Sequence, residues 1–528
     1  MRKLYIISII AILPLPGMAT DDIPENFNKE VIRPHTQIDS TDIISRIDAH
    51  DSRLRTISAA VWTNPAMRPF EFAHNYTTVS IGYNTERQSE SVCSMAGNGQ
   101  DRACFNAETY IKHGHATLWG QGCYSTGRRK SVIWNEVADA DMIYPYITAD
   151  ATGGDIESET YRFSGGYAGY NGQTTWGATL GYTAGQHYRD IDPRPRNITG
   201  RLDITAGIGR RISGKYIAAI SGEFMKYKQT SDIDFKNETG HATIYHLTGL
   251  GNDYVRFRGN GMTTLYDGKR YAAQLNIAPT DGNGMSATLR LSHMTIETIL
   301  DDINRLPMTE LWHKTLYAEL AYQHKGTTTS WGASAGIDIF RRHGKENIFS
   351  DAASATYPQI GTIEIYADNG YSASARGLIE HRFKTVRLTF EPSLTYSHRS
   401  QIYLEPPREW YINSLAVSQR MMCSARIGRH WHAKLTLTWA LCRPVESHFV
   451  TEDFFGIEYN NDNEALMTAL LSDFRYASAT IRTYSADGAI RYSINSRNAL
   501  QLSATFRHDS YTAGTTGNTM NINAGIIF

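Results

Sequence analysis

Apolar and polar positions alternate with a period of two along most of the chain, from about Val79 to its end. In one such segment the apolar positions are Trp431, Ala433, Leu435, Leu437, Trp439 and Leu441. Successive side chains of a β-strand point to opposite faces of the sheet, so each alternating segment has one apolar face and one polar face. The pattern therefore predicts a chain built mainly from long amphipathic strands.

The length of these segments favours strands that cross a membrane. They run for about 10 to 14 residues, whereas strands of soluble proteins cluster near about 5 or 6. About 11 residues at roughly 3.3 Å each, tilted by about 40°, climb about 28 Å, which matches the apolar core of a bilayer. Trp431 and Trp439 share a face and bracket an aliphatic centre, as an interfacial aromatic girdle requires. The alternative is a secreted soluble protein whose apolar rows pack between two stacked sheets.

The connections between the segments alternate between tight and long. Tight turns are predicted near Asn171-Gly172, Ser213-Gly214, Asp281-Gly282, Lys325-Gly326, Phe383-Lys384, Gly428-Arg429 and Ser496-Arg497. Long polar connections are predicted near residues 85–104, 125–157, 185–198, 229–267, 296–311, 342–371, 399–413, 443–478 and 508–517. Outer-membrane barrels have this asymmetry, with short periplasmic turns and long external loops.

These observations predict an all-β fold, a transmembrane antiparallel up-and-down β-barrel. Counting segments from Thr77 to Phe528 gives about 18 strands, with 14 and 16 as alternatives. The barrel domain is predicted to span residues 77–528, with its apolar face against outer-membrane lipid. Localisation in the outer membrane of a Gram-negative cell follows as an expectation.

The last segment carries the most specific single feature. Its apolar column consists of Met520, Ile522, Ala524, Ile526 and Phe528, and the chain stops on that aromatic residue. It resembles the C-terminal recognition strand of outer-membrane barrel proteins. The resemblance implies that the barrel-assembly machinery binds the strand ending at Phe528.

The first 76 residues do not alternate. Residues 1–19 have a short basic start, an apolar stretch and small residues near Ala19, which predicts a cleaved signal peptide. Residues 20–76 are predicted to form a periplasmic or plug segment. Ser40 and Thr41 are expected to cap a short helix that runs to about Ile57.

Within that segment lies the tripeptide Asn64-Pro65-Ala66. It resembles a stretch of the long-chain fatty-acid transporter superfamily, where it belongs to an N-terminal hatch inside the barrel. The resemblance implies a possible hatch at these residues and a hydrophobic solute. In its general architecture the whole chain resembles the poorly characterised outer-membrane barrel families of gut-type Gram-negative bacteria.

Composition narrows the classes of function. The net charge of −1 argues against a nucleic-acid partner, which requires a basic patch or stripe. The chain contains 31 Tyr and 9 Trp, amphipathic residues that suit a boundary between water and lipid. Among its five cysteines, Cys93 and Cys104 are expected either to staple one loop or to be free thiols. Cys423 and Cys442 do not face each other in the expected hairpin.

Motifs that would carry chemistry are weak. No P-loop or H-E-x-x-H pattern occurs, and we expect no enzyme and no cofactor. His430 and His432 suit either a metal or a solvated strand end, and His508-Asp509 either an acid–base pair or a chance dipeptide. Residues 460–464 carry oxygen ligands that suit calcium but are also typical of a polar loop before a short helix at 465–474.

Charged residues on the polar faces of the strands are the remaining candidates, because charge facing lipid costs a few kcal/mol near the midplane. The expected lumen-facing residues are Arg201, Asp203, Glu223, Arg290, Glu319, Asp338, Arg387, Glu391, Arg426 and Lys434. They would either stiffen a plugged barrel through cross-strand pairs or line a solute path. The leading hypothesis is a porin-like channel or transporter for an unidentified small solute. The alternative is a non-transporting surface or secretion-system scaffold that binds a protein partner through long external loops.

Overall fold

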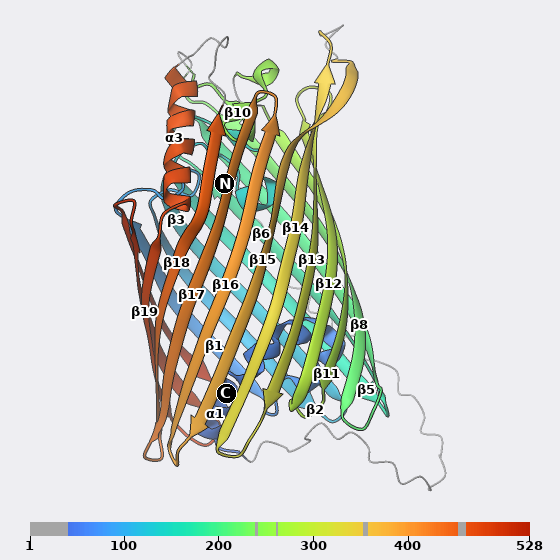
Figure 1. The fold of residues 1–528 in the computed structure, drawn as a ribbon, viewed down its shortest axis with the longest axis vertical. Helices are drawn as coiled ribbons and strands as arrows, with labels where there is room; N and C mark the ends of the chain where they lie inside the picture. Colours follow the sequence, from blue (N-terminus) through green and yellow to red (C-terminus); the bar gives the residue numbers. More distant parts are fainter. Residues whose placement is uncertain (1–40, 238–240, 260–261, 352–356, 452–460) are drawn as a thin grey trace, which may run out of the picture.

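The computed structural model describes residues 41–237, 241–259, 262–351, 357–451 and 461–528. Within these ranges eighteen strands form one antiparallel sheet, and the sheet closes because β1 pairs with both β2 and β21 (Figure 1). The predicted 18-stranded up-and-down barrel is confirmed. The predicted signal peptide, residues 1–19, lies outside the described residues.

The strands of the wall follow one another around the barrel in chain order. The first nine are β1 (Tyr76–Gln88), β2 (Gly99–His113), β3 (Ala116–Val132), β5 (Gly154–Asn171), β6 (Thr174–Tyr188), β7 (Arg194–Arg211), β8 (Tyr216–Asp234), β11 (Thr264–Pro279) and β12 (Gly284–Leu300). The other nine are β13 (Leu306–His324), β14 (Thr329–Phe349), β15 (Gln359–Arg382), β16 (Val386–Leu404), β17 (Pro407–Ile427), β18 (Trp431–Thr451), β19 (Ile481–Ser493), β20 (Ala499–Tyr511) and β21 (Thr516–Ile527).

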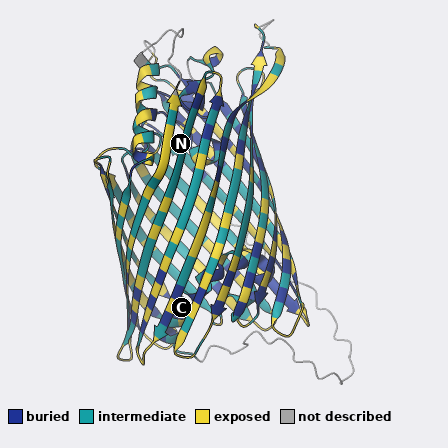
Figure 2. Cartoon of the chain, in the orientation of Figure 1, coloured by how far each residue is buried: buried dark blue, intermediate teal, exposed yellow. Residues whose placement is uncertain are grey.

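Alternating exposure along the strands separates an outer face from an inner one (Figure 2). On β18, Leu435 and Leu437 are about half exposed, whereas His432 on the other face is almost fully buried. Leucines can remain exposed in this way only where the outer surface meets lipid rather than water. The aliphatic rows therefore face outward, and the alternative of two stacked sheets is excluded.

The two mouths of the barrel differ as predicted, with one correction. All seven predicted tight turns occur at one mouth, and an eighth at Gly114, with φ +58°, was missed. At the other mouth several predicted long loops are short, and β16 and β17 are joined by residues 405–406 alone. These loops are short because the strands extend beyond the apolar band. Backbone pairing continues there although both faces of each strand are polar.

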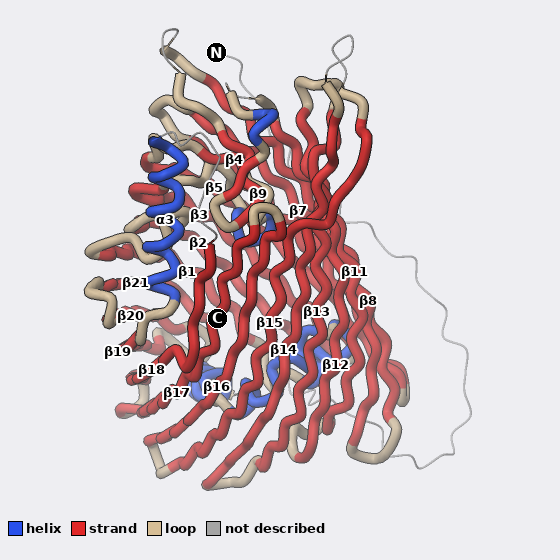
Figure 3. Tube along the Cα trace, turned by 45° about the horizontal axis from the view of Figure 1, so that its top comes forward, coloured by secondary structure: helices blue, strands red, loops and turns tan. Residues whose placement is uncertain are grey.

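The N-terminal segment lies inside the barrel at the mouth that carries the tight turns (Figure 3). It consists of α1 (Ile43–Asp51), η1 (Leu54–Thr63) and η2 (Pro65–Phe70). The predicted helix differs in both limits. Its cap is Asp42, whose carboxylate accepts a hydrogen bond from the Ser45 N–H at 2.6 Å, and α1 ends at Asp51 because the next residue is extended.

Folded loops cover the other mouth. They contain α2 (Ala140–Ile143), β4 (Thr148–Ala149), β9 (Tyr245–Gly249), β10 (Asn252–Asp253), η3 (Val255–Phe257) and α3 (Asn461–Ala477). β4, β9 and β10 form a small sheet of their own. None of the helices in the described ranges is long and apolar enough to span a membrane.

Candidate functional site

Residues on the inner face of β8 lie in three different environments at three heights between the two mouths. Ile217 and Ala219, near the tight turns, pack against the N-terminal segment. Met225 and Tyr227, further along, belong to the apolar core of the folded loops. Glu223 lies between these levels on the same face. Six residues separate Ala219 from Met225, about 20 Å at roughly 3.3 Å per residue, so the two closures are distinct.

The same three levels recur on β13. Ala321 packs against the N-terminal segment, and Leu311 packs in the core of the folded loops. Glu319 lies between them and accepts a hydrogen bond from the Tyr317 hydroxyl at 3.0 Å. We call the charged residues at this middle level the belt; its members on these strands and their neighbours are Arg201, Asp203, Glu223, Arg270, Arg290, Glu319 and Asp338.

Five of the seven belt residues form a network of ion pairs with alternating signs. Glu223 accepts from both Arg270 and Arg290, and Arg270 also lies 3.5 Å from Asp203. Arg201 donates to Asp203 at 2.8 Å. The side chains keep accessible surface, for example 31% for Arg290 and 15% for Glu223, so water reaches them inside the barrel. Such a surface can hold a polar solute without selecting strongly for one sign of charge.

Acidic residues of α1 attach the N-terminal segment to basic residues of the wall. Arg387 donates to Asp48 at 2.6 Å, and Lys434 donates to Asp51 at 2.9 Å. Arg491 makes a second ion pair with Asp51. We call these contacts the latch. Two further pairs of the segment with the wall are Arg426 with Asp42 at 2.8 Å and Arg53 with Glu391 at 3.0 Å.

Four of the ten expected lumen-facing residues therefore contact the N-terminal segment; they are Arg387, Glu391, Arg426 and Lys434. Four others, Arg201, Asp203, Glu223 and Arg290, belong to the ion-pair network of the belt. Glu319 and Asp338 lie at the same level outside that network. Whether any of them conducts a solute stays a prediction.

The surroundings of α1 shift the pKa values of two of its side chains, Asp51 and His50. Burial alone would raise the pKa of Asp51, but Arg491 and Lys434 outweigh it and hold the pKa well below its usual range. His50 stacks between the rings of Phe72 and Tyr76, at centroid distances of 4.7 and 3.9 Å. Burial, helped by Arg55, lowers the pKa of His50 to about 3, so the ring is neutral while the segment is docked.

The Asn64-Pro65-Ala66 stretch sits against two wall glycines. The Asn64 side chain accepts from the Ala66 N–H at 3.0 Å and donates to Asn276 of β11 at 3.1 Å. A Cβ at Gly207 would lie 2.3 Å from the Asn64 Oδ1, and one at Gly177 would lie 2.6 Å from the Pro65 carbonyl oxygen. Glycine is required at both positions for the segment to approach the wall this closely.

The face of the segment that looks toward the tight turns is hollowed. A cavity of about 920 Å³ lies there, lined by segment residues such as Arg55, Trp62 and Phe72 and by turn residues such as Asp281 and Lys325. The segment thus follows the inner wall around the mouth without filling it.

The closure at the opposite mouth is an apolar core with buried charge. Trp134, Tyr146 and Tyr245 are each about 1% exposed and pack together with wall residues of β8 and β11 to β13. Arg189 forms a fully buried ion pair with Asp150 at 2.7 Å and lies 3.5 Å from Glu136. Burial, together with Asp150, raises the pKa of Glu136.

Sequence reasoning missed this external core. Its signal was present, because the connection at 133–147 carries the apolar residues Ile133, Trp134, Val137, Ile143, Tyr146 and Ile147. A solvated loop would not contain so many. The wall also reaches into the core, since Arg342 of β14 donates to the backbone carbonyls of Asp141 and Tyr144.

The structure separates the residues of the weaker chemical candidates. His430 contacts Ser493, whereas His432 faces α1 and lies 3.9 Å from Asp48. His508 contacts Asn518, while Asp509 pairs with Arg507 at 2.8 Å.

The remaining candidates are also accounted for. Asp462 of the calcium candidate accepts from the Tyr245 hydroxyl at 2.7 Å, and the helix predicted at 465–474 is longer, spanning Asn461–Ala477. No group of three potential metal ligands occurs in the described part of the chain. Cys93, Cys104 and the other three cysteines are free thiols.

Comparison with known proteins finds one matching family model and remotely similar solved structures. A family model described as a family of unknown function, DUF6850, matches residues 65–528. No curated protein matches the sequence. Among solved structures, the ferric preacinetobactin receptor BauA of Acinetobacter baumannii has 8% identity and a TM-score of 0.39, and the match covers 86% of this chain and 79% of that one.

Two further solved structures have similar values. The siderophore receptor PiuA of Acinetobacter baumannii has 8% identity and a TM-score of 0.40, covering 86% of this chain and 82% of that one. The CymD monoaromatic hydrocarbon channel has 9% identity and a TM-score of 0.32, covering 88% and 90%. Two of these three proteins are described as receptors and one as a channel. The predicted membership of a poorly characterised barrel family is confirmed, and the resemblance to fatty-acid transporters stays a prediction.

Proposed function

This chain belongs to DUF6850, a family of unknown function, and from its own geometry we propose that it is a gated transporter of a small solute in the outer membrane. The N-terminal segment is the gate, and the belt is the solute path. The folded loops at the other mouth face the cell exterior and restrict which solutes reach the belt.

One observation carries this proposal: the interior is closed by two structures of different kinds, with water-accessible charged residues between them. Eighteen strands leave a lumen too wide for side chains alone to fill. A barrel that served only as an anchor would need neither two closures nor accessible polar residues at mid-height. Arg290 and Glu223 keep such accessible surface.

The way the gate is attached supports its release. Among the described residues, the N-terminal segment joins the wall covalently only where residue 75 leads into β1. Its other attachments include the latch, the pairs made by Asp42 and Arg53, hydrogen bonds such as Asn64 with Asn276, apolar contacts such as Ile57 with Ala321, and close packing on glycines. All of these can break without unpairing a strand of the barrel.

The belt also limits the class of solute. Acidic and basic side chains alternate in it, so neither cations nor anions are strongly favoured. We propose a small neutral or zwitterionic solute, held by hydrogen bonds that residues such as Arg290 donate and residues such as Glu319 accept. A purely apolar solute would have to desolvate these charges without replacing their hydrogen bonds.

Liposome swelling tests this function. The full-length chain and a variant lacking residues 21–72 are reconstituted, and the influx of neutral sugars and amino acids is measured. We expect slow influx for the full chain and fast influx for the deletion variant. Absence of influx in both proteins would contradict transport. A closed barrel that also co-purifies with one protein in fixed stoichiometry would support the scaffold alternative.

A further inference from the structure

The outer face of β11 to β15 carries an unusual row of polar side chains at a single level. Strand pairing places Tyr271 opposite His293, His293 opposite Lys314, Lys314 opposite Arg341, and Arg341 opposite Asn369. The row lies on the outward face, because Tyr271 is 58% exposed and Lys314 and Arg341 are also exposed. We call these residues the cationic row.

The cationic row lacks compensating acids. Two cations directly opposite each other on neighbouring strands repel each other and destabilise the sheet. Lys314 rests over the Trp312 ring at 4.7 Å, and neither Lys314 nor Arg341 forms an ion pair with any residue that the structure describes. The nearby Glu364 is engaged by His343 at 2.6 Å. In addition, the Nδ1 of His293 is buried without a hydrogen-bond partner in the described chain.

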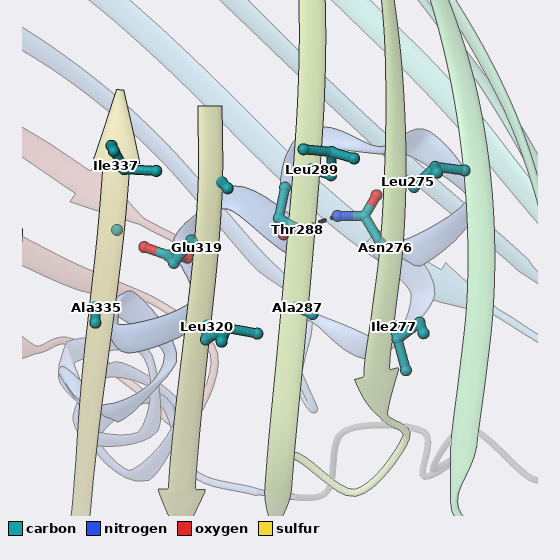
Figure 4. Close-up of a pocket in the computed structure, with 12 residues that line it drawn as sticks. Leu275, Asn276, Ile277, Ala287, Thr288, Leu289, Glu319, Leu320, Ala335 and Ile337 are labelled. Carbon is teal, nitrogen blue, oxygen red and sulfur yellow. Dashed lines mark hydrogen bonds between the residues drawn. The ribbon is translucent and has the colours of Figure 1, made fainter. Parts of the chain in front are cut away.

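Below the row, toward the tight turns, the outer face is hollowed. One depression of about 620 Å³ begins at His293, Lys314 and Arg341 and continues to Leu291, Leu316 and Ile339. A second, of about 630 Å³, follows on the same strands and is lined by Leu275, Ile277, Leu289, Leu320 and Ile337 (Figure 4). Small side chains between these leucines and isoleucines form its floor; they are Ala287, Ala318 and Ala335. We call the two depressions the apolar groove.

The row lies at the height where a lipid headgroup would be. Trp331, 43% exposed near the tight turn, marks the inner edge of the apolar band together with Tyr322, whose ring lies 5.1 Å away. Arg341 is ten residues further along β14. At about 2.5 Å of height per residue this is about 25 Å, the height of the apolar band of an outer-membrane barrel.

We propose that the cationic row and the apolar groove bind an anionic membrane lipid. Its phosphate lies among His293, Lys314 and Arg341, and its acyl chains fill the groove below. The phosphate relieves the repulsion between the opposed cations, and its oxygens can accept from the exposed Lys314 ammonium and Arg341 guanidinium. This inference rests on the membrane location of the proposed function but not on transport.

The chain offers an internal control at the same height. Arg482 of β19 is also exposed and outward-facing, ten residues from Tyr492 near the tight turns. Its cross-strand neighbours are Leu441 and Ser510, so no second cation lies opposite it. A single cation of this kind can orient toward water and has no need of a bound anion.

Lipid binding is measured by native mass spectrometry of the full-length protein with phosphatidylglycerol or with phosphatidylcholine of identical acyl chains. We expect the wild type to retain phosphatidylglycerol preferentially. The variant Lys314→Gln/Arg341→Gln should bind it about tenfold more weakly, and Arg482→Gln should bind like the wild type. Ala318→Phe, which fills the groove, should weaken retention of long-chain lipid.

The other outcomes separate the possible failures. Equal retention of the two lipids, or equal loss in the Arg482→Gln control, would overturn the proposal. Binding of glycerol 3-phosphate as tight as that of the lipid would show a free-phosphate site and would also overturn it. A protein that does not insert into nanodiscs contradicts the proposed membrane function itself. A protein that inserts but shows no lipid preference contradicts only the lipid site.

Discussion

The two closures of the barrel are joined to its wall in different ways. The N-terminal segment is one stretch of chain that, among the described residues, is joined covalently to the wall only at β1; ion pairs such as Asp51 with Arg491 and apolar contacts such as Ile57 with Ala321 hold it in place. The external closure combines loops that are tethered to strands at both ends, and its centre is an apolar core around Trp134. Ion pairs can exchange for water and counter-ions, whereas a broken apolar core exposes its whole surface.

This difference suggests that the two mouths have different roles in transport. The N-terminal segment can undock while all strand pairs remain intact, because its contacts are made with side chains of the wall and with the turn at residues 496–497. The external closure cannot leave the barrel without unfolding its core. We therefore expect gating at the mouth with the tight turns and a lasting restriction at the other mouth. The following four changes test that contrast.

Removing both acids of the latch should have the largest effect. Asp48→Asn/Asp51→Asn leaves Lys434 and Arg491 without their anion and leaves Arg387 with Glu380 alone. Loss of one partner of a buried pair costs about 3 to 5 kcal/mol, and the double variant should lose more in docking free energy. Single-channel recordings should show a barrel that is mostly open.

The matched control for the latch is Asp101→Asn. Asp101 pairs with Arg87 and Lys130 on the wall, but these residues are exposed and do not contact the N-terminal segment. Its channel activity should equal that of the wild type. Recordings in which the control opens as much as the latch variant would mean that the effect is not specific to docking.

The second change removes a large side chain from the apolar core of the external closure. Trp134→Ala removes the largest fully buried side chain of that closure and should cost it about 3 to 5 kcal/mol. Limited proteolysis should then cut within residues 133–153, while the docking of α1 stays unchanged. Simultaneous release of the N-terminal segment would show that the closures are coupled and would remove the contrast.

The third change pushes the Asn64-Pro65-Ala66 stretch away from the wall. In Gly207→Val the new side chain meets the Asn64 carboxamide, and overpacking of this kind costs roughly 1 to 3 kcal/mol. Open probability should rise, although less than in the latch variant. Gly222→Val on β8 is the control, because its Cβ would meet nothing within 4 Å. Identical behaviour of the two variants would argue against the hatch contact.

The smallest effect concerns pH. His50 has a pKa of about 3 in the docked segment, and an exposed histidine has one near 6.5, so the undocked segment takes up the proton first. Docking is therefore strongest above about pH 6.5 and weakens as the pH falls toward 3. Between pH 7 and 5.5 the loss is about 1 kcal/mol.

The His50→Phe variant provides the comparison for the pH effect. A phenyl ring keeps the stack between Phe72 and Tyr76 but cannot be protonated. Its open probability should therefore stay flat over this pH range while that of the wild type rises. A wild-type channel that closes further on acidification would have the opposite sign from the one expected.

The wall could be predicted from the sequence because its rule is local. Alternation around Leu435 and Leu437 sets which face meets lipid, and the same rule identifies the final strand. The count of 18 followed from turns such as Asn171-Gly172, whose glycine adopts φ +60°. Loop lengths were wrong where strands such as β16 continue into polar sequence, since pairing there no longer needs an apolar face.

The candidate site was less predictable because its contacts join distant parts of the chain. The pair between Asp51 and Arg491 spans 440 positions, and nothing local to either residue indicates the other. Lys434 could be placed on the polar face of its strand, but its partner on α1 could not be derived. Trp134 was missed because its segment does not alternate, and the absence of alternation was interpreted as a solvated loop.

Hydrogen exchange measured on both closures in one reconstituted sample tests the central claim most directly. We predict that backbone amides in peptides covering residues 43–70 exchange faster than those covering 134–149, and that Asp48→Asn/Asp51→Asn accelerates only the first set. Faster exchange in the external core, or acceleration of both sets together, would contradict a gate formed by the N-terminal segment.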